Sequence, residues 1–194
     1  MYLLPKEIKE NALFIADAHY PHHGDSFLNI LKALKNKSIE TPQLFLMGDI
    51  FDLLFGHNEY IKTFSKEGIE LLQQLSQKIE IFYIEGNHDF CLQELFPNIT
   101  VYKREEQPVH FTLNSQNIYL SHGDRYTAGV LYNVYSTLLR NKKMLTLLKF
   151  LRSAYTIHHK SPCFLHRVCS AFFHTSRLLQ QKRQIKYIST IATP

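Results

Sequence analysis

Four short polar clusters in this chain contain side chains of the types that bind metal ions and transfer protons. Each cluster directly follows an apolar run, and together they are Asp17-Ala18-His19, Gly48-Asp49-Ile50-Phe51-Asp52, Gly86-Asn87-His88-Asp89 and His122-Gly123-Asp124. Carboxylate, imidazole and amide groups together suit borderline divalent cations such as manganese, iron or zinc. A single Asp-x-His or Gly-Asp is a weak signal, because such pairs often only make turns. The four clusters in order, roughly one βα unit apart, predict one site.

The apolar runs that precede these clusters have the length and composition of buried strands. They cover residues 12–16, 43–47, 79–85 and 117–121. Short, continuously apolar runs are typical of parallel strands covered on both faces. Apolar residues at helical spacing in 27–34 and 61–75 separate the first three runs and give βαβαβ order. Because sites in such sheets form at the carboxyl ends of the strands, we expect the four clusters to meet at one edge of a sheet.

The pattern changes after Asp89. Short strand candidates at 99–102, 109–113 and 118–120 predict antiparallel strands added to the sheet. From about residue 130 to 181 the spacing of apolar residues is helical again, with a break at Pro162. We therefore predict an α/β fold with a core domain at 1–129, a basic apolar helical insertion or cap at 130–181 and a short tail at 182–194.

The net charge of +5 conceals two oppositely charged parts of the chain. Through Asp124 there are 10 Lys and Arg against all 17 Asp and Glu, a balance of −7. From Arg125 onward there are 12 Lys and Arg and no acidic residue, a balance of +12. This asymmetry favours an acidic part that holds metal ions and a basic part that faces an anionic partner.

Composition also narrows the class of protein. The three cysteines, Cys91, Cys163 and Cys169, are scattered and lack zinc-type spacing, which argues against a disulfide framework and for a reducing compartment. No signal-peptide pattern is present at the start, and no uncharged apolar run reaches about 18 residues. We expect a cytoplasmic protein without a membrane span.

The chemistry that fits the clusters is phosphoryl hydrolysis. Two ions roughly 3.5–4 Å apart, bridged by one carboxylate, can bind a phosphoryl group and generate hydroxide for in-line attack. Asp49 is the natural bridge, because its strand lies between those of the other candidate ligands. His88 could donate a proton to a phosphoryl oxygen or to the leaving group. Asp52 and Asp89 are expected to orient the ligating imidazoles, or His88, by contacting them without binding the metal themselves.

The four clusters, taken as a set, resemble the ordered motifs of the calcineurin-like metallophosphoesterases over residues 12–124. That resemblance implies a four-layer αββα sandwich and two metal ions. By the same resemblance Asp17, His19 and Asp49 would hold one ion, and Asp49, Asn87 and His122 the other. Asn87 and His88 would also contact the substrate, and Asp124 would support the ligands from behind. Manganese is the expected metal, with iron or zinc as alternatives.

Within that superfamily the sequence is most similar to UDP-2,3-diacylglucosamine hydrolases of lipid A synthesis, in which a basic helical insertion follows His-Gly-Asp. The chain departs from their pattern in three places. It has His88 where those hydrolases have Arg, and Ala128-Gly129 where they have an acidic pair. No Gly-His-x-His motif occurs before Pro194. From this we expect at least one metal ion to bind weakly.

Three functional interpretations follow. The leading one is a two-metal hydrolase that cleaves the pyrophosphate of a nucleotide-linked lipid at the inner membrane face. The first alternative is a phosphatase or phosphodiesterase with a soluble substrate, and the second is a weakly active relative that acts as a binding protein. An anionic membrane surface is the expected partner. Nucleic acid is disfavoured, because the aromatic residues of the basic part lie among leucines, as in Tyr155, Phe172, Phe173 and Tyr187. The sequence does not indicate an oligomeric state.

Overall fold

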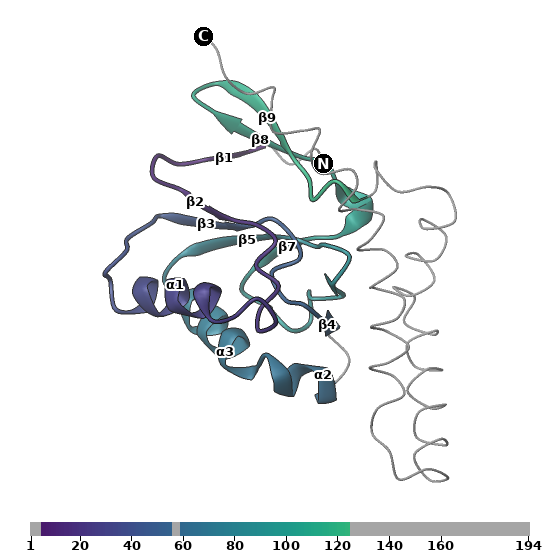
Figure 1. Ribbon diagram of the computed structural model, residues 1–194. Helices are drawn as coiled ribbons and strands as arrows, with labels where there is room; N and C mark the ends of the chain where they lie inside the picture. The colour runs from purple at the N-terminus through teal and green to yellow at the C-terminus, as the bar shows by residue number, and fades with distance from the viewer. Residues whose placement is uncertain (1–4, 56–58, 125–194) are drawn as a thin grey trace, which may run out of the picture. The chain divides into compact units, whose positions relative to one another are not determined.

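The computed structural model describes residues 5–55 and 59–124 (Figure 1). Its strands are β1 (Lys6–Glu7), β2 (Leu13–Ile15), β3 (Gln43–Leu46), β4 (Leu54–Phe55), β5 (Glu80–Ile84), β6 (Asp89–Phe90), β7 (Thr100–Tyr102), β8 (Val109–Leu113) and β9 (Gln116–Leu120). Its helices are α1 (Ser26–Lys35), α2 (Glu59–Phe64), α3 (Lys66–Leu75) and the 3₁₀ turn η1 (Arg104–Glu106). In this part of the chain no helix is long and apolar enough to cross a membrane.

The main sheet has the strand order β2-β3-β5-β7, and all neighbouring pairs are parallel. Its two central strands are buried along nearly their whole length, as their apolar sequences predict. The register places Phe14, Phe45 and Phe82 in one row across the sheet. The carboxyl ends of β2, β3 and β5 therefore point in the same direction, toward the first three polar clusters.

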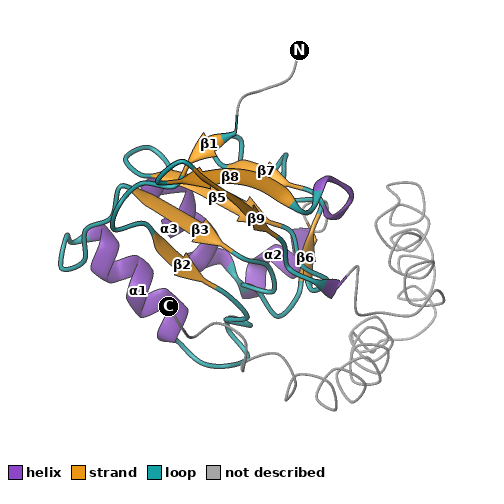
Figure 2. Cartoon of the chain, turned by 90° about the horizontal axis from the view of Figure 1, so that it is seen from above, coloured by secondary structure: helices purple, strands orange, loops and turns teal. Residues whose placement is uncertain are grey.

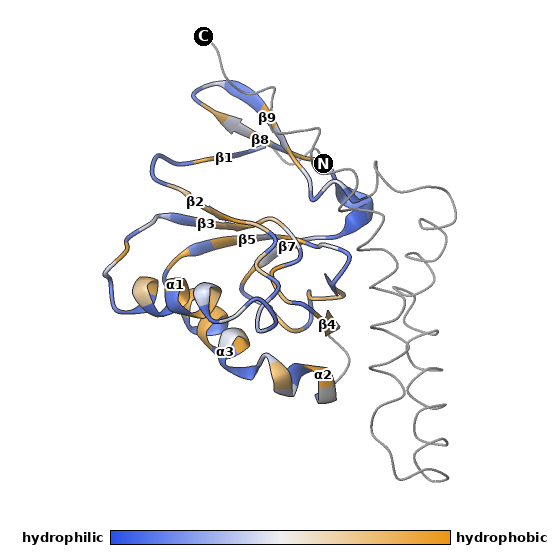
Figure 3. Cartoon of the chain, viewed as in Figure 1, coloured by the Kyte–Doolittle hydropathy of each residue, from blue (hydrophilic) through white to orange (hydrophobic). Residues whose placement is uncertain are grey.

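Alternation along the central strands separates two hydrophobic cores. The side chains of one face pack with α1 and α3, which lie together on that side of the sheet (Figure 1), and include Leu44, Leu46, Ile81 and Tyr83. Figure 3 shows apolar and polar residues alternating along both helices, as expected when only one face is buried. The other face carries Phe45 and Phe82 and forms the second core.

A second sheet, with the order β1-β8-β9, covers that other face (Figure 2). In it, β1 pairs parallel with β8, and β8 pairs antiparallel with β9. The ring of Phe111 on β8 lies 5.3 Å from the rings of both Phe45 and Phe82, edge to face. This aromatic contact attaches the β8–β9 hairpin to the main sheet, and so determines where the chain leaving β9 can place its polar cluster.

The predicted α/β class is confirmed. The described residues form three of the four predicted layers. Two details of the prediction were wrong. β7 joins the main sheet in parallel rather than antiparallel, because it follows a crossover from β5. β8 and β9 form the second sheet rather than extending the first.

The helical pattern at 61–75 divides at Ser65 into α2 and α3. The predicted insertion at 130–181 and tail at 182–194 lie outside the described residues, so that division of the chain remains a prediction.

Asp89 joins the ends of the two central strands. Its fully buried carboxylate accepts hydrogen bonds from the backbone N–H groups of Asp49 (3.0 Å), Ile50 (2.7 Å) and Gly86 (2.9 Å). It also accepts one from the backbone of Phe51 (3.2 Å) and one from the hydroxyl of Tyr83 (2.6 Å). A buried carboxylate is tolerated only when such donors surround it.

We expect Asp89→Asn to lower the free energy of unfolding of the metal-free protein by about 3 kcal/mol, because an amide nitrogen would face donors that need an acceptor. Urea denaturation measures this. The matched control is Asp25→Asn, an exposed carboxylate without a capping hydrogen bond, which should change stability by less than about 0.5 kcal/mol. Equal stability of the two variants would contradict the role of Asp89.

Candidate metal centre

The candidate ligands lie at the carboxyl ends of β2, β3 and β5 and just after β9. Backbone hydrogen bonds tie these loops to one another: Asp17 N–H donates to the carbonyl of Gly48 (3.2 Å) and His19 N–H to that of Asp49 (3.0 Å). The N–H of His88 donates to Asp49 Oδ1 at 2.9 Å. The third cluster is therefore hydrogen-bonded directly to the carboxylate of the second.

Three of these residues have left-handed backbone conformations. The φ angles are 51° for Asp17, 45° for His19 and 52° for Asp49. Non-glycine residues are uncommon in this region, although Asp and His tolerate it better than most. Such conformations persist where the surrounding structure imposes them and are concentrated at functional sites. Here they occur together in the loops that present candidate ligands.

Asp17, Asp49 and His122 form the first group, with one potential ligand atom from each within 4.8 Å of the others. His122 Nε2 lies 3.5 Å from Asp49 Oδ2 and 3.3 Å from Asn87 Oδ1. The other ring nitrogen of His122, Nδ1, lies 3.1 Å from the carbonyl oxygen of Met47, which can only accept. Nδ1 must therefore carry a proton, which leaves Nε2 of the neutral ring as an acceptor.

This geometry calls for a positive charge. With neutral His122, the atoms that converge are a carboxylate oxygen, an amide oxygen and an imidazole lone pair, all acceptors. Burial lowers the pKa of His122, but the hydrogen bond and charge of Asp49 outweigh it and raise that pKa to about 10. His122 in turn holds the pKa of Asp49 well below its ordinary value, although burial alone would raise it. In the metal-free chain, the proton on His122 thus occupies the place that suits a cation.

His19, Asp52 and His88 form the second group, again within 4.8 Å. The His19 and His88 rings meet edge to face, with centroids 4.8 Å apart. His88 Nδ1 donates to the backbone carbonyl of Asp52 at 2.7 Å, so its Nε2 is left as the other functional atom. The Nε2 atoms of His19 and His88 are each 4.0 Å from Asp49 Oδ2. Asp49 therefore lies between the two groups.

The donor set fits divalent ions. Asp49 is buried, with 3% of its surface exposed, and three imidazoles have Nε2 within 4.0 Å of its Oδ2 atom. One ring nitrogen in the site, His19 Nδ1, is buried without a hydrogen-bond partner. Oxygen and imidazole donors without thiolate are the combination expected for manganese, iron or zinc.

The structure brings together most of the residues that the sequence pointed to, in a different grouping. Asp17 lies with His122, whereas His19 lies with Asp52 and His88. Asp52 Oδ1 is 3.7 Å from His19 Nδ1, a position from which a carboxylate can orient that ring. The Asp89 carboxylate contacts backbone amides and Tyr83 instead of an imidazole. The ligand and catalytic roles of these residues remain predictions.

Two residues that sequence reasoning missed, Gln107 and Arg104, hold the chain around His122 in place. Gln107 Oε1 accepts the N–H of His122 at 2.9 Å, and Gln107 Nε2 donates to the carbonyl of Glu85 at 2.8 Å. Arg104 forms a buried ion pair with Asp124, 2.7 Å between Nε and Oδ2. These contacts connect the chain after β9 to the end of β5. Neither Gln107 nor Arg104 belongs to a motif, so no pattern in the sequence signals these pairings.

Gly86 shows how closely the loops approach. A Cβ atom there would collide with the backbone and carboxylate of Asp49 and would lie 2.9 Å from Asp89 Oδ1. Only glycine allows this contact between the ends of β3 and β5.

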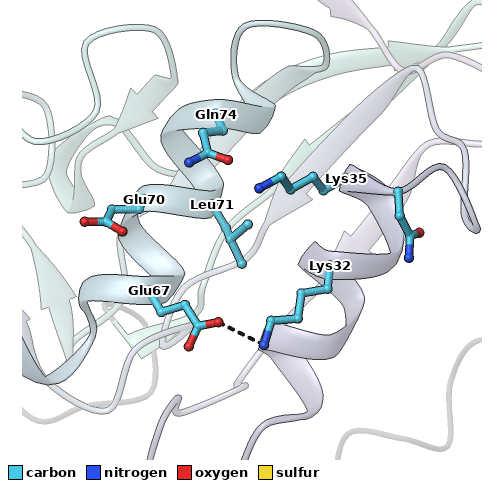
Figure 4. Close-up of a pocket in the computed structure, with 7 residues that line it drawn as sticks. Lys32, Lys35, Glu67, Glu70, Leu71 and Gln74 are labelled. Atoms are coloured by element: carbon cyan, nitrogen blue, oxygen red, sulfur yellow. Dashed lines mark ion pairs between the residues drawn. The ribbon is translucent and has the colours of Figure 1, made fainter.

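A surface groove lies elsewhere, between α1 and α3 (Figure 4). It is lined by charged residues that compensate one another, as in the ion pair between Lys32 and Glu67 (2.9 Å). None of its lining residues belongs to the four polar clusters. The acceptor geometry around Asp49, rather than the shape of this groove, identifies the functional site.

Comparison with known families agrees with this site. A family model described as "Calcineurin-like phosphoesterase" matches residues 11–188. Because this match covers most of the chain, the chain belongs to the calcineurin-like phosphoesterase family. The resemblance drawn from the four clusters is confirmed, and so is the predicted class, a metal-dependent phosphoesterase, at the level of the family.

Curated relatives share one name. UDP-2,3-diacylglucosamine hydrolase of Coxiella burnetii is 28% identical over 115 residues, which cover 59% of this chain and 47% of that protein. The protein of that name from Chromohalobacter salexigens is 31% identical over 120 residues, 60% of this chain and 48% of that protein. The one from Vibrio cholerae is 27% identical over 116 residues, with 59% and 48% covered. The chain spans about half the length of these relatives.

We expect Asp49→Asn to lower the pKa of His122 in the metal-free protein well below about 10, because burial is then opposed only by the weaker effects of the Asp124 and Asp89 charges. NMR titration of the ring measures this, and Asp25→Asn is the matched control. The His122–Asp49 pair should stabilise the metal-free fold fully between about pH 3.8 and pH 6.5, and that contribution should be lost as pH rises through about 10 and as Asp49 is protonated at low pH. An unchanged titration in Asp49→Asn would contradict the pairing.

Proposed function

We propose that this chain is a phosphoesterase whose site holds two divalent ions, with Asp49 as the shared ligand. The observation that carries the proposal is the position of Asp49 Oδ2, 3.5 Å from His122 Nε2 on one side and 4.0 Å from His19 and His88 Nε2 on the other. Ions bound there would supply Lewis acidity and a water of lowered pKa. Manganese is our first choice of metal, because carboxylate oxygens and imidazoles both contribute.

The remaining roles follow from the orientation of each side chain. Asp17, His19, Asn87 and His122 are the proposed ligands beside Asp49. The hydrogen bond from His122 Nδ1–H to Met47 directs Nε2 at the cluster, the usual arrangement of a ligating imidazole. His88 is oriented in the same way by the carbonyl of Asp52. We assign His88 a different role, because a proton held on its Nε2 can pass to the oxygen that leaves phosphorus.

The substrate that we propose is a pyrophosphate diester, and specifically UDP-2,3-diacylglucosamine, the compound in the name of the relatives. Cleavage would break one P–O bond of the pyrophosphate and add water across it. The support is similarity to these relatives over about 60% of the chain, together with the family match over residues 11–188, which include all four clusters. A soluble phosphodiester or phosphomonoester is the competing substrate class, favoured by His88, the residue general to the superfamily.

Metal analysis of two variants tests the division of roles. Asp49→Asn should lose bound metal and activity together, because Asp49 is shared by both ions. His88→Asn should keep its metal and slow turnover by about 10² to 10⁴, the usual contribution of a proton donor. The control is His110→Asn, on β8, which should affect neither. Equal loss of metal in the Asp49 and His88 variants would show that His88 is a ligand.

Product analysis tests the substrate. The manganese-loaded chain should release UMP from UDP-2,3-diacylglucosamine faster than it hydrolyses bis(p-nitrophenyl) phosphate or p-nitrophenyl phosphate at equal concentration. Faster hydrolysis of either p-nitrophenyl compound would favour the soluble-substrate alternative. Bound metal without hydrolysis of any of the three would favour the binding-protein interpretation.

We further propose that the basic part of the chain attaches it to an anionic membrane surface. The support is sequence alone: 12 Lys and Arg and no acidic residue from Arg125 onward, in a part outside the described residues. Each basic side chain that reaches such a surface contributes roughly 1 kcal/mol, and the attraction weakens with salt. The full chain should therefore float with phosphatidylserine-containing vesicles at low salt and not with neutral vesicles. Equal recovery with both would contradict the proposal.

A further inference from the structure

A short loop after His19 carries two more histidines beside the metal centre. The loop is attached at Tyr20, whose N–H donates to the carbonyl of Ile50 (2.9 Å) and whose carbonyl accepts the N–H of Asp52 (3.0 Å). Tyr20 is buried, whereas His22 and His23 are exposed. The N–H of His23 donates to the carbonyl of His19 at 3.0 Å, which folds the loop back over that residue.

The imidazoles form a series that leads from Asp49 to the surface. His19 Nε2 is 4.0 Å from Asp49 Oδ2, the His19 and His23 ring centroids are 4.9 Å apart, and those of His23 and His22 are 5.6 Å apart. Exposure rises along the series: Asp49 has 4% of its side chain exposed and His19 12%, and both outer histidines are exposed. The outer rings are therefore close to a candidate ligand, but they lie further out than His19.

The charge of one outer histidine, His22, acts on Asp52. Burial raises the pKa of Asp52, but the contact with His19 and then the charges of His88 and His22 lower it below its ordinary value. Imidazole N–H groups at such a rim are donors suited to anionic oxygens. Neither His22 nor His23 appears in the two groups able to share one ion among the described residues. A role in binding the substrate is more consistent with their position than a role as ligands.

We propose that His22 and His23 bind a second phosphate group of the substrate, next to the phosphoryl group that is attacked at the metal centre. The attacked phosphoryl group must lie beside Asp49, where His88 and His122 already approach within 4.0 Å. The outer histidines follow His19 in the series and are more exposed than it, a position that suits an adjoining group. Two adjoining phosphates define a pyrophosphate, so this pair would select diphosphate over monophosphate substrates. The inference rests on the proposed function of the metal centre.

The test compares the binding of UDP and UMP to the manganese-loaded full chain by calorimetry, at one fixed concentration of free Mn²⁺. UMP offers one phosphate for the metal centre, and UDP offers a second for the outer histidines. The double variant His22→Ala/His23→Ala should weaken UDP binding by about 10-fold to 100-fold, about tenfold for each lost hydrogen bond to a charged group. Its UMP binding should change less than about threefold. His23→Gln, which keeps an N–H donor, should recover part of the UDP affinity, and His110→Ala is the control.

Each other outcome overturns the inference. Equal weakening of UDP and UMP would place the histidines on the attacked phosphate, and no change in either would remove them from the site. Loss of bound manganese in the double variant would make them ligands. Failure of the unchanged protein to bind UDP more tightly than UMP would exclude a second phosphate position. The proposed function is judged separately by hydrolysis of bis(p-nitrophenyl) phosphate by the unchanged protein, whose absence would count against the metal centre and not against the outer histidines alone.

Discussion

The candidate site depends on one buried carboxylate that is not itself a candidate ligand. Asp89 lies beneath the loops and accepts hydrogen bonds from the backbone of both strand ends, at Asp49, Ile50 and Gly86. Burying a charge without such donors would cost several kcal/mol. The loops after β3 and β5 therefore cannot separate without either exposing the Asp89 carboxylate or leaving it buried without donors. This constraint sets the distance between β3 and β5 at their carboxyl ends, and with it the position of Asp49 relative to Asn87 and His88.

The backbone N–H of Asp49 donates to Asp89. The side chain of Asp49, unlike that of Asp89, lies beside hydrogen-bond acceptors. The outer oxygen of its carboxylate and the amide oxygen of Asn87 both lie beside Nε2 of His122, and in the metal-free protein a proton on that nitrogen relieves the contact between acceptors. The two carboxylates thus have different surroundings. Hydrogen-bond donors fully satisfy the carboxylate of Asp89, whereas the carboxylate of Asp49 still needs a cation beside it. A site built in this way would favour a metal ion, because its protein partners alone leave it electrostatically incomplete.

Membership in the calcineurin-like phosphoesterase family explains the chemistry more readily than the substrate. The four clusters lie within residues 11–188, the part of the chain that matches the family model. By our proposal, the residues that bear on the choice of substrate lie at the rim, where exposed histidines extend the row of imidazoles beyond His19. Residues at a rim contact the parts of a substrate that do not react, and therefore influence which substrate binds without changing the reaction.

The sequence by itself determined the fold class and which polar clusters meet at the ends of the strands, because buried parallel strands leave continuous apolar runs and their polar ends stand out. The roles of the individual side chains in these clusters remain predictions. The tertiary structure alone decided the grouping of the side chains around Asp49. It also showed that Asp89 serves the backbone and that His122 comes from a second sheet, held by Gln107. Such pairings join residues far apart in the chain through single hydrogen bonds and aromatic contacts. Such pairings leave no periodic pattern in the sequence, because each pairing needs only two residues of suitable type, one on each of the two segments it joins.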